Sequence, residues 1–305
     1  MQNWKKNLLS GGMAVIACLL VVMFGLLVWQ LTGEQRRVMA QGYLANSENY
    51  LKQNDSQALW ELTKAYVLDL SYSDYRIKQA KMFYSLSDAR AEEELKEVIG
   101  NGWADDEIYF DYAQIMLAKG LDSEAVKYLK KVSAGADEKL KNQVLLDLVK
   151  LAGDQGKWEE AVGFRQQLSE LDKNNIERLR YEAALAIVTA DIDDGLKAKL
   201  EKIMGVSFSE ERWEVLQKVN GDSYVVQAAD WLLDLELPRW GRNYLQQLGQ
   251  TSLEVIDVYL LYAKSYWLEG KEALAVDYVD RAYQIDSTNK SVRYWLELID
   301  SGCDS

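Results

Sequence analysis

The sequence predicts an all-α protein, with one apolar helix near its start, an array of stacked helix pairs and a closing helix. Three observations predict this fold class. The 21 residues Gly11–Leu31 carry no charge, and a helix needs roughly 20 apolar residues to cross a bilayer. Beyond them, apolar residues recur at helical spacing in blocks of about 34 residues. The 305-residue chain also has only one proline, so helices can run with few interruptions.

Three interpretations apply to the apolar span Gly11–Leu31. A cleaved signal peptide has an apolar core of roughly 7–15 residues, which is shorter than this span. Val38–Ala40 has the small residues of a cleavage site, but Arg36 and Arg37 lie between it and the span. We therefore favour an uncleaved transmembrane anchor and divide the chain into an anchor region, 1–33, and a repeat domain, 34–305.

The third interpretation is lipidation at a cysteine within the span. Val15–Cys18 resembles the lipobox of bacterial lipoproteins, in which polar residues usually follow the cysteine. Here the apolar stretch Leu19–Val28 follows instead, which disfavours this alternative.

Charges near the span bear on its orientation. Lys5 and Lys6 precede it, whereas Glu34, Arg36 and Arg37 follow it. Basic residues favour the cytoplasmic side of a membrane, and the short N-terminal stub is basic. We expect a single-pass membrane protein whose residues 34–305 lie outside the cytoplasm.

The repeat is clearest in Ile256–Asn289. Its first half predicts a helix with Tyr259, Tyr262, Ala263 and Tyr266 on one face, followed by a glycine, Gly270, that ends it. Its second half predicts a helix whose buried face carries small and branched residues: Ala275, Val279 and Ala282.

This unit resembles the tetratricopeptide repeat family, whose 34-residue consensus has small residues at positions 8, 20 and 27. Counted from Ile256, those positions are Ala263, Ala275 and Ala282. The resemblance implies an α-solenoid of about six to seven helix pairs, closed by a capping helix at Ser291–Asp300.

The same pattern can be followed, with varying clarity, over residues 40–290. The units before Ile256 begin near Gly42, Tyr72, Asp106, Asn142, Ile176 and Gly221. In the unit from Ile176, Gly195 stands where the family has a small residue of the second helix. About eleven extra residues follow within Gly205–Asn220, and Pro238 suits the first turn of a later helix.

Composition restricts the partners and the chemistry. The first 33 residues hold two lysines and no acid, so the remaining 33 basic and 48 acidic residues give residues 34–305 a net charge of −15. Such a surface repels phosphate backbones, and we expect no nucleic-acid partner. Cys18 and Cys303 lie inside the span and at the C-terminal tail, so they predict no structural disulfide.

The residues available for catalysis are few. The chain has no histidine, which excludes serine–histidine and cysteine–histidine catalysis, and it has no Gly-rich phosphate loop. Asp191–Gly195 resembles a calcium loop, but position 12 would be Lys202 instead of a bidentate glutamate. We predict no enzyme activity, no cofactor and no metal site.

The family resemblance also implies where a protein partner binds. In tetratricopeptide arrays, positions 2, 5, 9, 12 and 13 of the first helices line a concave groove. Carried over to this chain, the candidates are Arg76, Phe83, Tyr84, Phe110, Gln114, Leu117, Lys150, Arg180, Lys264 and Trp267. Aromatic side chains and isolated cations suit an extended peptide or a partner helix. Each of these residues has an alternative role in packing within the array.

The family's carboxylate clamp has lysine at position 5, where this chain has Phe110, Leu146 or Leu260. Capture of a C-terminal carboxylate is therefore not predicted.

Two functions fit these patterns. The first is a membrane-tethered scaffold that binds protein partners in an envelope or secretion assembly. The second is a structural subunit that packs through its repeats on a membrane complex or on copies of itself, so a homo-oligomer stays open.

Overall fold

The computed structural model describes residues 23, 33–53, 57–68, 71–132, 136–168, 175–205, 213, 221–248 and 255–302. Within these residues it contains fifteen α-helices, and their order along the chain confirms the all-α prediction. Apart from Met23, the predicted anchor Gly11–Leu31 lies outside the described residues. None of the described helices is long and apolar enough to span a bilayer.

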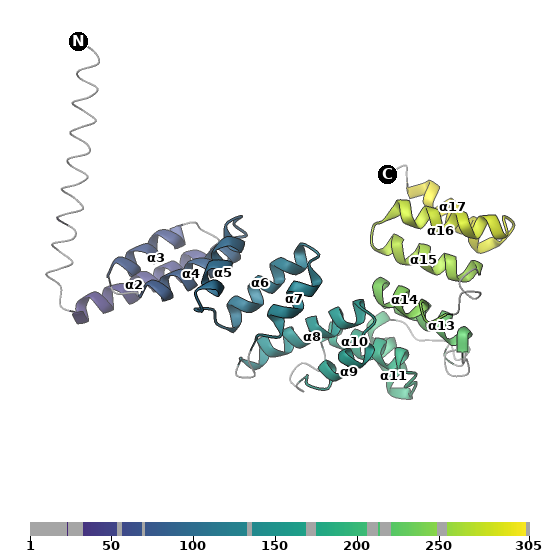
Figure 1. Ribbon diagram of the computed structural model, residues 1–305, viewed down its shortest axis with the longest axis horizontal. Coiled ribbons are helices and arrows are strands. Elements are labelled where there is room, and N and C mark those ends of the chain that lie inside the picture. The colour runs from purple at the N-terminus through teal and green to yellow at the C-terminus, as the bar shows by residue number, and fades with distance from the viewer. Residues whose placement is uncertain are drawn as a thin grey trace, which may run out of the picture. The chain divides into compact units, whose positions relative to one another are not determined.

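The helices fall into two compact units, residues 1–133 and 134–305 (Figure 1). The helices of unit 1 are α2 (Gly33–Lys52), α3 (Gln57–Leu68), α4 (Tyr72–Ser85), α5 (Ala91–Gly100), α6 (Asp106–Ala118) and α7 (Asp122–Leu129). Those of unit 2 are α8 (Glu138–Asp154), α9 (Trp158–Arg165), α10 (Ile176–Val188), α11 (Asp194–Met204), α13 (Gly221–Asp234), α14 (Pro238–Leu245), α15 (Ile256–Leu268), α16 (Glu272–Ile285) and α17 (Lys290–Gly302).

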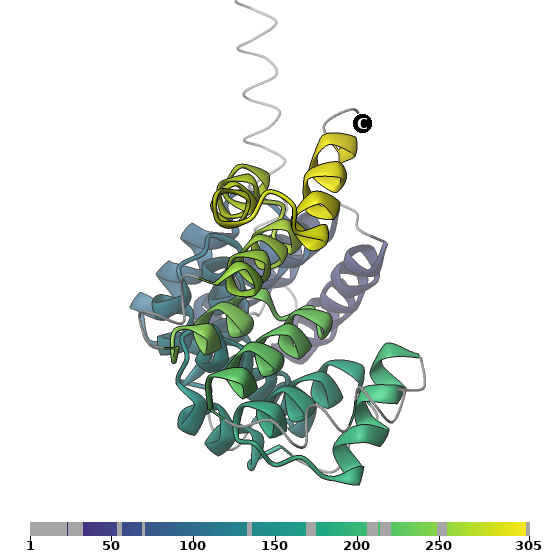
Figure 2. The ribbon, with the colours of Figure 1, turned by 90° about the vertical axis from the view of Figure 1, so that its right-hand side faces the viewer.

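Helices pair in chain order within each unit. In unit 1, α2 packs on α3, α4 on α5 and α6 on α7; in unit 2, α8 packs on α9, α10 on α11, α13 on α14 and α15 on α16. The last helix, α17, contacts both α15 and α16, and Figure 2 views the molecule from the side of these C-terminal helices. The described residues thus contain seven pairs and the predicted closing helix.

Small residues lie at the centre of each pair. Ala263 of α15 and Ala275 and Ala282 of α16 are fully buried, as their positions in the repeat predicted. Without bulky side chains, two helix backbones can approach closely, and branched residues fill the space around them. Fully buried alanines recur in the other pairs: Ala58, Ala80, Ala113, Ala125, Ala161, Ala183 and Ala228.

The middle of the array differs from its predicted pattern. Gly195 is exposed in the first turn of α11, while Leu196 and Leu200 supply the buried face of that helix. Pro238 stands in the first turn of α14 as predicted. Most of the extra segment within Gly205–Asn220 lies outside the described residues.

A left-handed residue ends the first helix of six pairs. Three are glycines with φ near +70°, namely Gly120, Gly156 and Gly270; the others are Ser87, Ala190 and Glu236, with φ from +53° to +58°. After each, the next amide N–H bonds to the carbonyl five residues back, as Asp191 N does to Ala186 O at 2.8 Å. This is the Schellman ending, which favours glycine because a Cβ is strained there.

Replacing Ala190 with glycine will stabilise the protein. A left-handed alanine costs about 1–2 kcal/mol, and the added chain entropy of glycine offsets about 0.5–1 kcal/mol of that. We expect Ala190→Gly to raise the free energy of unfolding by about 0.5–1 kcal/mol, measured by urea denaturation. Ala198→Gly, at an exposed position inside α11, is the control and should destabilise by about 1 kcal/mol. Equal losses in both variants would contradict the strain at Ala190.

One contact in unit 2 joins helices that are far apart in the sequence. The indole of Trp240, in α14, is fully buried against Gly153 of α8. Its Nε1 donates a hydrogen bond to the carbonyl oxygen of Lys150 at 3.3 Å, and Asn243 Nδ2 donates to Asp154 O at 2.8 Å. We call this contact of α14 with α8 the Trp240 clasp.

Candidate functional site

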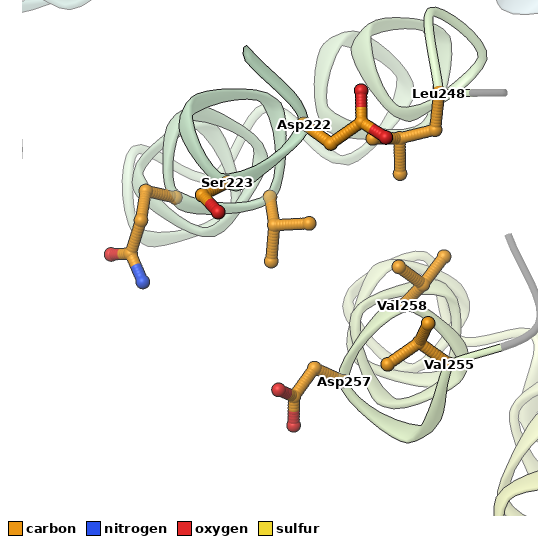
Figure 3. A pocket seen from close by; sticks show the side chains of 8 residues that line it. Asp222, Ser223, Leu248, Val255, Asp257 and Val258 are labelled. Atoms are coloured by element: carbon orange, nitrogen blue, oxygen red, sulfur yellow. The ribbon is translucent and has the colours of Figure 1, made fainter. Parts of the chain in front are cut away.

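Two surface hollows lie along the first helices of the last two pairs. One hollow of about 360 Å³ separates α13 from the start of α15. Figure 3 shows Asp222 and Ser223 of α13 on one wall, with Asp257 and Val258 of α15 on the opposite wall. The remaining lining residues are Val226, Gln227, Leu248 and Val255.

A second hollow of about 370 Å³ continues the first toward α17. The two share Val226, Gln227 and Asp257, so they form one continuous depression, which we call the α13–α15 groove. The second hollow adds residues from α13, α15 and α17: Asp230, Leu260, Leu261, Lys264, Ser291 and Trp295. The groove therefore runs across three helices of one unit.

The single lysine of this lining is already engaged by two carboxylates. Lys264 Nζ lies 2.7 Å from both Asp230 Oδ1 and Asp234 Oδ1, which ties α15 to α13. Burial lowers the pKa of Lys264, but the hydrogen bonds and charges of the two aspartates outweigh it, so the pKa is raised overall. At neutral pH the ammonium is charged and balanced within the groove.

One carboxylate of the lining, that of Asp257, takes no part in that balance. Asp257 lies in the first turn of α15, is exposed, and forms no ion pair with any described residue. Asp222 lies in the first turn of α13, across the hollow. The lining thus combines apolar side chains with a net negative charge.

Among the predicted site residues of unit 2, only Lys264 lines this groove. Trp267 packs edge-to-face on Trp295, with ring centroids 6.4 Å apart, and so contacts a lining residue without lining the groove itself. Lys150 is exposed and pairs with Asp154 at 3.1 Å. Arg180 pairs with Glu236 at 3.0 Å. The structure does not gather these four side chains at one place.

Two predicted site residues of unit 1 serve packing instead. Phe83 is 2% exposed, with the guanidinium of Arg90 4.2 Å from its ring centre, which corrects its assignment to an open groove. Arg76 forms ion pairs with Glu94 at 2.6 Å and Glu97 at 2.5 Å. These two ion pairs join α4 to α5, so the Arg76 guanidinium is not available to a partner.

The other four predicted residues of unit 1 are half-buried. Tyr84 lines a hollow of about 280 Å³ with Ile115 and the turn between α4 and α5. Leu117 packs on the unit's core. Phe110 and Gln114 lie one turn apart on α6, so a partner role for them stays a prediction.

The groove residues that sequence reasoning missed include Asp257, Asp222 and Trp295. Position 2 of the repeat is Asp257 in one unit and Asp222 in the preceding one, so the position rule already contained them. The sequence alone does not single them out, because aromatic and basic side chains are the commoner anchors of an interface. Trp295 belongs to the closing helix, which the repeat positions do not cover.

A fourth hollow, of about 260 Å³, lies between α9, α10 and α11, and contains a cluster of paired charges. Glu182, which is nearly buried, accepts a hydrogen bond from Arg178 Nε at 3.0 Å and lies 3.1 Å from Lys199 Nζ. Arg165 lies 3.6 Å from the same carboxylate. We interpret this cluster as structural.

The calcium-like stretch Asp191–Gly195 forms a turn and a helix start. Asp193 caps α11, where its Oδ1 accepts a hydrogen bond from Leu196 N at 2.7 Å. Within the described residues, no group of three or more acidic or cysteine side chains is arranged to hold a metal ion.

Comparison with known proteins adds little to this description. No family model matches the chain, and no curated protein matches it. Among solved structures, it is similar to the TPR domain of P58(IPK), with a TM-score of 0.31 and 15% identity over 88% of this chain and 78% of that one. It is also similar to pilF of Pseudomonas aeruginosa, with a TM-score of 0.28 and 16% identity over 86% of this chain and 98% of that one. At these TM-scores the superpositions are poor.

Proposed function

We propose that this chain is a tetratricopeptide-like scaffold whose α13–α15 groove binds a segment of a protein partner. The observation that carries the proposal is the continuity of the groove, in which two hollows share Val226, Gln227 and Asp257. A continuous groove across several helices suits an extended segment or a helix better than a compact small molecule. An enzymatic role has no support in the residues that line it.

The lining has the composition of a peptide site. Val226 and the exposed Val255 offer apolar contacts, while Gln227 and Ser223 offer hydrogen-bonding groups. Apolar side chains of a partner gain free energy on burial here, at about 25 cal/mol per Å². The polar groups of the groove fix the position of the partner segment along it.

A charged side chain on the groove floor will reduce partner recovery. The change is Val226→Glu, because Val226 lines both hollows and a buried carboxylate there repels an apolar partner. We expect recovery of co-purified protein to fall about tenfold or more, measured by quantitative mass spectrometry after affinity purification of the full chain. Asp280→Lys, on the exposed face of α16, is the matched surface control and should leave recovery unchanged.

Two controls make the result interpretable. Circular dichroism must show that Val226→Glu retains the helical content of the unchanged chain. If recovery is the same for the folded variant and the unchanged chain, the groove is not where the partner binds.

We further propose that Gly11–Leu31 tethers the scaffold to a membrane, with residues 34–305 outside the cytoplasm, in an envelope or secretion assembly. The support is the length and lack of charge of that span and the basic stub before it. Tethering raises the effective concentration of a weakly bound partner. A reporter that is active only outside the cytoplasm, fused after Ser305, tests the orientation, and a silent reporter would reverse it.

A second candidate function is a structural subunit that packs on other proteins through unit 1. Trp60 on α3 is 64% exposed and Tyr72 on α4 is 52% exposed, and such aromatic residues favour contact surfaces. The mass of the purified full chain in detergent distinguishes the two candidates. A stable oligomer formed without another protein would support this second function.

A further inference from the structure

We propose that the α13–α15 groove selects a partner segment that carries a lysine or arginine next to apolar side chains. This inference rests on the proposed function and specifies the chemistry of the partner. It is the opposite of the lysine-based recognition of acidic peptides, for which the groove has no available cation among its lining residues.

The first step of the argument concerns Lys264. Its ammonium already lies 2.7 Å from the carboxylates of Asp230 and Asp234. An acidic partner would compete with these two carboxylates for the ammonium, whose charge they already balance. Lys264 therefore holds α13 and α15 together and does not recruit acidic groups.

The second step concerns Asp257. Its carboxylate projects from the first turn of α15, lines both hollows, and has no ion-pair partner among the described residues. Asp222 stands on the facing wall of the first hollow (Figure 3). Because the Asp257 carboxylate has no ion pair of its own, it creates a negative potential in the groove, which a cationic side chain neutralises.

The third step concerns the apolar surface beside these carboxylates. Val226 and the exposed Val255 present apolar surface in the same hollow as Asp257, above the buried side chains of Val258 and Leu248. A lysine or arginine side chain can bury its methylene stem on such a surface while its charged end reaches a carboxylate. An apolar neighbour in the partner segment then covers the remaining valine surface.

The test uses the full chain with a photo-crosslinking amino acid at Gln227, which lines both hollows. After irradiation in the cells that produce the protein, the crosslinked segment is sequenced by mass spectrometry. We expect a segment with lysine or arginine within a few residues of an aliphatic or aromatic side chain.

Charge variants in the crosslinker background test the role of Asp257. Removing one exposed ion pair weakens binding a few-fold, and reversing the charge adds repulsion. We therefore expect Asp257→Asn to lower the crosslink yield about threefold and Asp257→Lys about tenfold. Asp280→Lys, which makes the same charge change on the outer face of α16, should stay within about twofold.

The outcomes distinguish failure of the basic-segment proposal from failure of the groove function. A neutral or acidic crosslinked segment, or equal yields for Asp257→Lys and Asp280→Lys, overturns the basic-segment proposal and leaves the groove function intact. No crosslink from Gln227, together with unchanged partner recovery in Val226→Glu, overturns the groove function itself. Thermal melting of each variant excludes unfolding as the cause of a lower yield.

Discussion

Gly153→Ala will destabilise the protein, although alanine favours helices over glycine by about 1 kcal/mol. A Cβ at position 153 would lie 1.9 Å from Cε2 of Trp240, and the indole is fully buried, so it has no space to move into. Overpacking of this kind costs about 1–3 kcal/mol and sometimes more. We expect a net loss of about 2 kcal/mol, measured by urea denaturation with an unchanged m-value.

Two further variants separate the clash from other causes. Gly163→Ala in α9 introduces a Cβ with no atom within 4 Å, so it should be neutral or stabilise by up to about 1 kcal/mol. In a Trp240→Leu background, Gly153→Ala should lose its cost, because the indole atoms that clash are gone. An equal cost in both backgrounds would contradict the packing described for the Trp240 clasp.

Glu182→Gln will cost about 3 kcal/mol, because it removes the carboxylate of a buried ion pair. The side chains of Arg178 and Glu182 are 7% and 8% exposed, and they are joined at 3.0 Å. The amide retains the size of the side chain but replaces the carboxylate beside the buried Arg178 guanidinium with a neutral group. Chemical denaturation at neutral pH measures the loss, and Glu297→Gln on the exposed face of α17 serves as the control.

The same substitution will change the dependence of stability on pH. Burial raises the pKa of Glu182, but hydrogen bonds from Arg178 and Lys199 outweigh it and hold the pKa below its ordinary value. The unfolded chain therefore binds the proton more readily, and stability is lost as pH falls from about 4.3 through the lower folded pKa. We expect Glu182→Gln to lose less stability than the unchanged chain over this acidic window. Parallel losses would contradict the shifted pKa.

The sequence predicted the helix pairs because their causes are local. The small residues Ala263, Ala275 and Ala282 and the left-handed Gly270 each act within one pair, so their spacing alone indicates the fold. Ala190 and Glu236 adopt the same left-handed turn without glycine, and no local pattern reveals them. Packing of the whole pair imposes the conformation there.

The functional surface was harder to predict, because a position rule does not show which charges are already paired. Arg76 occupies a groove position but binds Glu94 and Glu97 of its own pair, and Phe83 is buried beneath Arg90. Asp257 satisfies the rule and lines both hollows. The sequence does not show that Lys264, the lysine of the same groove, is already paired with Asp230 and Asp234. Only the structure therefore identifies Asp257 as the lining residue whose charge is not balanced.

The Trp240 clasp also has a consequence for how unit 2 unfolds. A simple repeat array has only nearest-neighbour contacts, so it can open pair by pair from either end. Trp240 and Asn243 of α14 donate hydrogen bonds to carbonyl oxygens of α8. The helices between α8 and α14 therefore cannot separate without breaking both their own contacts and the Trp240 clasp. The segment from α8 to α14 should therefore exchange its amide hydrogens as one cooperative block, whereas α15 to α17 can open without breaking the clasp, with loss of the Lys264 ion pairs to α13. The groove spans the boundary between these two blocks, so a bound segment would join them and slow exchange in both.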